Sequence, residues 1–315
     1  MPSAASISGR PVVRPLAALL AAALLATSGL PASASEAESD GASWVHKVET
    51  WQKDRNASLL EEDSWLSLVG LFWLHEGENP FGSDAGNVVI LPEGKAPAVA
   101  GVLLREGNAV RVRVAPGAGV TSGGEPVTEQ ALTPDSAGEP TVLELGTLSF
   151  YVIVRGDRIG VRIKDKESPV RKAFHGIDFY PIQAAWRIDA RFEPYDPPKK
   201  VAIPNVLGQV TEADSPGAVV FERDGKTYRL DALGSVKDGL DTLFADTTNG
   251  HETYGAGRFL DLGPVVNGRV EVDFNTAYNP PCAFTAFATC PLPPKDNKLT
   301  LAVTAGERKF GEGHP

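Results

Sequence analysis

The sequence predicts a mainly β protein with antiparallel sheets of the sandwich or barrel type and a short helical segment at its N-terminus. Short runs rich in Val, Ile and Leu recur about every ten residues from Asn87 onward, bounded by Gly, Pro, Asp or Asn. Residues 110–114 alternate strictly between valine and arginine, which is typical of a strand with one buried and one wet face. Trp44, Val48 and Trp51 recur at spacings of three and four residues, which indicates a helix.

The N-terminus resembles a targeting segment rather than part of the fold. Arg10 and Arg14 precede an uninterrupted Leu/Ala run, and an Ala-x-Ala pattern ends at Ala34. This order predicts a signal peptide over residues 1–34 with cleavage near Ala34. The apolar run, residues 16–26, is much shorter than the roughly 20 residues that span a bilayer. We therefore expect an exported protein, periplasmic or secreted, with no retained membrane anchor.

The remaining chain divides into a leader and two β halves. Residues 35–42 are small and acidic and predict a flexible leader. Residues 43–166 hold the helical segment and a first β half, and residues 167–315 form a second β half. The apolar stretch from Trp65 to Leu74 belongs to the core, but its period leaves helix and strand open. The Gly/Pro-rich residues 116–138 predict a long surface excursion.

Strand signals mark both halves. In the first half they lie at 87–91, 109–114, 141–145, 148–154 and 158–163. In the second half they lie at 186–192, 201–203, 218–221, 228–232, 243–244, 258–260, 270–274 and 299–303. Residues 223–226, Arg-Asp-Gly-Lys, predict a hairpin turn, because Asp-Gly tolerates the positive φ angles of a tight turn.

Composition excludes several partner classes. The 315 residues carry a net charge of -10, and removal of the predicted signal takes away two arginines and no acidic residue, which leaves -12. Nucleic acids and anionic membranes attract Lys and Arg, and no basic stripe reverses the acidic balance. We therefore expect neither as a partner. The sequence indicates no cofactor and no particular oligomeric state.

Unusual polar residues concentrate in the C-terminal third. Arg258 is a fixed positive group that can hold a carboxylate or phosphate bidentately. Tyr254, Asn275, Tyr278 and Asn279 are suited to orient a small polar or anionic ligand beside it. The preferred hypothesis is therefore ligand binding in a C-terminal pocket.

Two alternatives stay open, so the sequence does not decide whether the protein is an enzyme. Asp246 or Asp273, acting with His251, are candidate catalytic residues of a hydrolase. Alternatively, Arg258 pairs with Asp273 in a network that shapes a structural envelope protein without an active site.

The two cysteines, Cys282 and Cys290, lie eight positions apart among prolines. An exported protein meets oxidising conditions, so we expect a disulfide between them. Their spacing does not match a zinc site and no second pair exists, so no metal site is predicted. A nucleophilic Cys282 would require a nearby histidine, for which His251 is the candidate.

Several of these segments together resemble a known family. They are Trp65-Leu66-Ser67-Leu68, Thr253-Tyr254-Gly255, Gly257-Arg258-Phe259-Leu260, Asp273-Phe274-Asn275, residues 277–283 (Ala-Tyr-Asn-Pro-Pro-Cys-Ala), residues 290–294 (Cys-Pro-Leu-Pro-Pro) and Ala305-Gly306-Glu307. The chain resembles the bacterial and archaeal family called domain of unknown function 1684 over residues 44–308. The resemblance implies a mainly β protein and assigns no activity.

Overall fold

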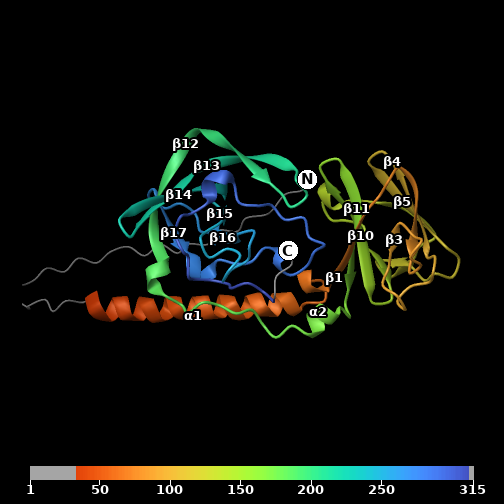
Figure 1. Ribbon diagram of the computed structural model, residues 1–315, viewed down its shortest axis with the longest axis horizontal. Helices are drawn as coiled ribbons and strands as arrows, with labels where there is room; N and C mark the ends of the chain where they lie inside the picture. Colours follow the sequence, from red (N-terminus) through yellow and green to blue (C-terminus); the bar gives the residue numbers. More distant parts are fainter. Residues whose placement is uncertain (1–32, 312–315) are drawn as a thin grey trace, which may run out of the picture. The chain divides into compact units, whose positions relative to one another are not determined.

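The computed structural model describes the backbone of residues 33–311 and the side chains of residues 41–311 (Figure 1). Within this part the protein is mainly β with antiparallel sheets, as the sequence predicts. The N-terminal helix is also present, but its 28 residues make it longer than the short helical segment expected. The chain divides between Asp40 and Gly41, and the described residues from Gly41 onward form one compact unit. Most of the predicted signal peptide, residues 1–32, lies outside the described residues. None of the described helices is long and apolar enough to cross a bilayer.

Helix α1 spans Ser33–Leu60, so the prediction of a flexible leader over residues 35–42 is wrong for this structure. Alanine, which occurs repeatedly in this segment, favours the helical conformation. Further along, Trp44 and Val48 are buried, and Trp44 Nε1 donates to Asp273 Oδ2 at 2.6 Å. These contacts hold the helix against the second β half.

Two sheets of the first half share one core and form a β-sandwich. The first has the order β1 (Leu68–Trp73), β11 (Arg158–Asp165), β10 (Leu148–Arg155), β9 (Leu143–Leu145), β6 (Thr121–Ser122), β7 (Glu125–Pro126). The second has the order β3 (Val89–Ile90), β2 (Gly77–Gly82), β4 (Gly101–Glu106), β5 (Ala109–Val114), β8 (Glu129–Leu132). Their inner faces meet in one apolar cluster, where the rings of Phe81 and Phe150 lie 5.7 Å apart. Among these pairings β2 and β3 are parallel and the others antiparallel.

The third sheet belongs to the second half (Figure 1), with Arg258 at the start of one edge strand and Asp273 at the end of the other. Its order is β16 (Arg258–Leu262), β15 (Gly239–Phe244), β14 (Lys226–Ser235), β13 (Val210–Arg223), β12 (Arg187–Pro204), β17 (Arg269–Asp273). Asp224 and Gly225 have φ angles of 50° and 72°, which confirms the predicted hairpin. Residues 299–303, predicted as a strand, form no sheet: Leu299, Leu301 and Val303 instead fill the core of this sheet.

Short elements complete the described chain. They are α2 (Pro169–Lys172) and 3₁₀ turns at Trp65–Ser67, Asp135–Ala137, Ala184–Trp186, Phe274–Thr276, Pro281–Ala283 and Lys295–Asn297. The apolar stretch 65–74 resolves into a 3₁₀ turn followed by β1. Residues 116–138 contain β6, β7 and β8, because their glycines and prolines serve tight turns between short strands. The division of the fold at residue 166 stays a prediction.

Candidate functional site

Arg258 begins β16 and lies completely inside the protein. Its Nη2 donates to Asp246 Oδ2 at 2.8 Å and to Val303 O at 2.9 Å, and its Nη1 donates to Ala305 O at 2.5 Å. Neither side chain of the ion pair has exposed surface, and Asp246 Oδ1 also accepts from the N–H and hydroxyl of Thr248. Both terminal nitrogens of the guanidinium already donate to acceptors of the protein, and no solvent reaches the group. Arg258 is therefore not placed to hold an anionic ligand.

Asp273 and Asn275 also serve internal contacts. Asp273 accepts from Trp44 Nε1 and, through Oδ1, from the Asn275 backbone N–H at 3.0 Å and Nδ2 at 2.8 Å. The Asn275 side chain bonds both backbone groups of Gln183, at 2.9 and 3.0 Å. Arg258 pairs with Asp246 rather than with Asp273, which corrects the pairing considered from the sequence. Through these contacts, residues 273–275 connect the end of β17 to helix α1 and to the segment around Gln183.

Asn279 links the C-terminal segment to helix α1. Its backbone N–H donates to Glu307 Oε2 at 2.7 Å, and its Nδ2 donates to Arg308 O at 2.7 Å. Arg55 of α1 donates to Glu307 Oε1 at 2.8 Å and to Asn279 O at 3.0 Å. Glu307 has no exposed surface, and this burial raises the pKa of its carboxyl group. Asn279 thus acts as a structural tie.

His251 and Tyr254 lie on the turn that follows β15. His251 is exposed, and its backbone N–H donates to Thr248 O at 3.1 Å. Among the described residues, no hydrogen bond joins its ring to Asp246 or Asp273, so the structure does not assemble the predicted Asp/His pair. The Tyr254 hydroxyl donates to Cys282 O at 3.2 Å, and burial raises the pKa of Tyr254 to about 12.

Tyr278 is the predicted ligand residue that lines a cavity, whose volume is about 350 Å³. Lining residues come from the third sheet and from the loop that carries the cysteines: Ile203, Leu233, Asp241, Thr242, Leu243, Phe259, Asp261, Tyr278 and Pro291. Asp241 on β15 lies directly opposite Asp261 on β16, and Leu243 lies opposite Phe259. Tyr278 exchanges two backbone hydrogen bonds of 2.9 Å with Phe259, which fixes its ring beside this ladder.

Two carboxyl groups and one phenol converge on the cavity. The Tyr278 hydroxyl donates to Asp261 Oδ1 at 3.0 Å. Burial, together with the neighbouring charge of Asp261, raises the pKa of Tyr278, so the phenol stays protonated and donates. Burial, and then the charge of Asp261, also raises the pKa of Asp241. Within residues 41–311 neither carboxylate has an ion-pair partner, so two like charges face each other across the ladder.

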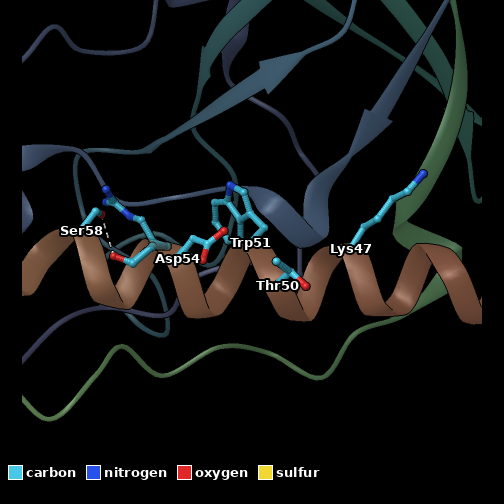
Figure 2. A pocket seen from close by; sticks show the side chains of 6 residues that line it. Lys47, Thr50, Trp51, Asp54 and Ser58 are labelled. Carbon is cyan, nitrogen blue, oxygen red and sulfur yellow. Dashed lines mark hydrogen bonds between the residues drawn. The ribbon is translucent and has the colours of Figure 1, made fainter.

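The ring of Tyr278 connects this cavity to helix α1. Its centroid lies 6.5 Å from that of Trp51 and 5.8 Å from that of Phe259, and the Arg55 guanidinium lies 5.1 Å from it. Figure 2 shows Lys47, Thr50, Trp51, Asp54 and Ser58 along an open groove on the helix. Trp51 and Arg55 line this groove and also contact Tyr278, so the helix supports the wall of the cavity.

Cys282 and Cys290 are free and buried, and they lie against each other. The Cys282 N–H donates to Cys290 Sγ at 3.0 Å, and the Cys290 N–H donates to Cys282 Sγ at 3.3 Å. The predicted disulfide therefore stays a prediction, although the two side chains adjoin. Pro291, which directly follows Cys290, lines the cavity.

The comparison with family models decides the relationship of the chain. Residues 172–308 match the family described as "Protein of unknown function (DUF1684)". The chain belongs to the DUF1684 family. Every residue that lines the cavity lies inside the DUF1684 segment, whereas Trp51 and Arg55 of α1 lie outside it.

Solved structures give further similarities to parts of this DUF1684 protein. The solution NMR structure of an uncharacterized protein of Haloarcula marismortui is 30% identical over 44% of this chain and 78% of the other, with a TM-score of 0.37. A structure from a study of phosphothreonine-dependent FHA domain interactions is 17% identical over 30% of this chain and 92% of the other, with a TM-score of 0.22. A search of curated proteins found no similar protein.

Asp241 and Asp261 are the residues of the DUF1684 segment that sequence reasoning missed. Both occur in alternating runs, at Leu240-Asp241-Thr242-Leu243 and Leu260-Asp261-Leu262. Alternation correctly predicts that the aspartates point away from the core. The alternation does not show whether a loop covers the outer face of the sheet. An aspartate that lines a cavity therefore has the same sequence pattern as an aspartate in bulk solvent.

The raised pKa of Asp241 predicts a pH-dependent effect of its replacement. A carboxyl group whose pKa is higher in the folded state stabilises the fold below its unfolded pKa, and this contribution is lost as pH rises through the folded pKa. Asp241→Asn is therefore expected to raise the free energy of unfolding at about pH 7 and to have little effect at about pH 3. Urea unfolding at both values measures this, with exposed Glu222→Gln on β13 as the control. A destabilised Asp241→Asn at neutral pH contradicts the prediction.

Proposed function

We propose that this DUF1684 protein binds a small organic cation in the cavity beside Tyr278. The proposal departs from an anionic ligand because Arg258, the group that an anion would need, is buried and occupied by Asp246. The single observation that carries it is the unpaired carboxylate pair Asp241 and Asp261 at the cavity.

The cost of this pair supports the choice of a cation. Like charges directly opposite on neighbouring strands are destabilising. Asp241 is partly buried and Asp261 is exposed, so solvent screens this repulsion in part. A ligand with a positive charge would remove this repulsion, whereas a neutral or anionic ligand would not. Phe259 and Tyr278 add aromatic surface that favours a cation over a neutral group of the same shape. The remaining aliphatic lining residues provide contact for an apolar body.

Binding is tested with matched pairs of ligands. Choline and its neutral isostere 3,3-dimethylbutan-1-ol have the same shape and differ in charge, and putrescine adds a primary diamine. We expect choline or putrescine to raise the melting temperature and the neutral alcohol to leave it unchanged. Asp241→Asn and Asp261→Asn are expected to weaken binding about tenfold each, which is about 1.4 kcal/mol. Isothermal titration calorimetry measures the affinities.

Glu222→Gln is the matched control, because it removes an exposed carboxylate from β13, away from the cavity, and lowers the net negative charge equally. Its affinity for the cation should equal that of the wild type. Equal binding of the cation and its isostere, or binding of anions alone, would contradict the proposal.

Export is part of the same proposal. It is supported by the positive start, the 11-residue apolar run and the Ala-x-Ala pattern that ends at Ala34. N-terminal sequencing of the mature protein would place the cleavage near Ala34. The acidic balance supports small molecules rather than nucleic acid as partners.

The two alternative functions now depend on different residues. A hydrolase would rely on Asp241 and Asp261, because one carboxyl group with a raised pKa beside a second carboxylate is an arrangement suited to acid–base catalysis. Turnover of a glycoside panel that Asp241→Asn abolishes would favour it over simple binding. A structural role is supported by the network around Arg258, which is buried and whose two terminal nitrogens donate to Asp246, Val303 and Ala305.

A further inference from the structure

The loop between Tyr278 and Pro294, here called the cysteine–proline loop, places two thiols in one small buried cluster. Cys282 and Cys290 are 7% and 5% exposed and pack with Ala288, Trp65 and Tyr254. Each cysteine directs its backbone N–H to the sulfur of the other, at 3.0 and 3.3 Å. This reciprocal contact brings the sulfurs together without help from a histidine.

A buried arginine from another sheet accompanies the thiols. Arg162 of β11 is 3% exposed, and its guanidinium lies 5.5 Å from the centroid of the Trp65 ring. Its Nη2 donates to Thr289 Oγ1 at 3.4 Å, beside Cys290 in the chain. Its Nε has no hydrogen-bond partner among the described residues. A buried positive charge with an unused donor favours an anion close by, and the thiol pair is the group that can supply one.

The two thiols are not equivalent. A hydrogen bond from the Cys290 thiol, helped by the Cys290 backbone N–H and by the charge of Arg162, lowers the pKa of Cys282. The same hydrogen bond, together with burial, raises the pKa of Cys290. These opposite directions make Cys282 the sulfur that loses its proton more readily.

We propose that Cys282 and Cys290 form a redox-active dithiol that a small peroxide oxidises, with Cys282 as the attacking and Cys290 as the resolving sulfur. The proposal goes beyond ligand binding and does not depend on it. A peroxide is the fitting oxidant because both residues are buried and only a small molecule reaches the sulfurs. A redox-active dithiol also differs from a purely structural disulfide, because only the redox-active pair requires one sulfur to react first.

The chemistry balances in two steps. The Cys282 thiolate attacks one peroxide oxygen, the O–O bond breaks, and hydroxide leaves and takes up a proton as water, which leaves a sulfenic acid on Cys282. Cys290 sulfur then attacks Cys282 sulfur, the S–O bond breaks, and the hydroxyl group leaves with the Cys290 proton as a second water. The two sulfurs lose two electrons and hydrogen peroxide gains them, so the products are one disulfide and two waters.

The test follows the thiols of the reduced, folded protein during titration with hydrogen peroxide. We expect both free thiols to disappear together and one disulfide between Cys282 and Cys290 to appear in peptide mass spectra. Dimedone, which traps sulfenic acids, should label Cys282 strongly in Cys290→Ser and should label Cys290 weakly in Cys282→Ser. Partial alkylation of the wild type, which needs no variant, should modify Cys282 first.

Arg162→Gln tests the role of the charge, and Arg158→Gln is its matched control. Both arginines lie on β11 over a tryptophan ring, at 5.5 Å from Trp65 and 5.7 Å from Trp73, but Arg158 is exposed. Loss of Arg162 is expected to slow oxidation about tenfold through a smaller thiolate fraction, and loss of Arg158 to leave the rate unchanged. First reaction at Cys290 in the wild type, or two thiols that survive peroxide while the unfolded chain is oxidised, would overturn the proposal.

Discussion

Arg258→Ala is expected to lower the free energy of unfolding by about 3–5 kcal/mol, because it leaves a buried carboxylate without its partner. Asp246 has no exposed side-chain surface, so water does not replace the lost guanidinium. The same change leaves the carbonyl groups of Val303 and Ala305 without their donor. We expect the loss of stability to be greatest around residues 303–305, which Arg258 attaches to the third sheet.

Urea unfolding followed by tryptophan fluorescence measures this effect. Arg269→Ala is the matched control: it removes an arginine of the same sheet that pairs with Asp189 at the surface, where both side chains are more than half exposed. Its expected cost is about 0–1 kcal/mol. A double variant, Arg258→Met with Asp246→Leu, should be more stable than Arg258→Ala, because no unpaired charge remains. Equal costs for Arg258→Ala and Arg269→Ala would show that the buried pair has no structural role.

Phe274→Ala is expected to lower the free energy of unfolding by about 3–5 kcal/mol. Phe274 has no exposed surface, and its ring centroid lies 5.7 Å from Trp186, 5.7 Å from Phe221 and 5.3 Å from Phe244. These three partners come from different segments, so an alanine leaves a cavity that no single side chain can fill.

Phe274→Leu is the control for this change, because it keeps most of the apolar volume and should cost about 1–2 kcal/mol. Thermal and urea unfolding of the three proteins give the comparison. Phe274 does not line the cavity beside Tyr278. The wild type, Phe274→Ala and Phe274→Leu should therefore have similar affinities for the cation once each affinity is corrected for the fraction of unfolded protein. A stability of Phe274→Ala equal to that of Phe274→Leu would contradict the assigned position of this ring in the core.

Local patterns predicted much of the secondary structure. The alternation at residues 110–114 became β5, with Val110 and Val112 buried, and the Asp-Gly turn at 224–225 joined β13 to β14. These features depend on neighbouring residues and backbone preferences alone. The helix start and residues 299–303 were predicted incorrectly, because helix length and sheet pairing depend on partners far along the chain.

The candidate site shows the same division. The sequence singled out an unusual polar segment, and Tyr278 from this segment lines the cavity. Arg258 has the residue type of an anion site, but it is enclosed with Asp246. Asp241 and Asp261, whose local pattern is that of ordinary surface residues, come together at the cavity through cross-strand pairing.

The sequence by itself determined the mainly β class, the N-terminal helix and the DUF1684 relationship, because these depend on side-chain periodicity and on short motifs. The tertiary structure alone decided which polar groups face each other and which face a cavity. Both properties depend on neighbours in three dimensions. Packing enclosed Arg258 within the protein and placed the buried Arg162 near Cys282 and Cys290, and strand pairing placed Asp241 opposite Asp261.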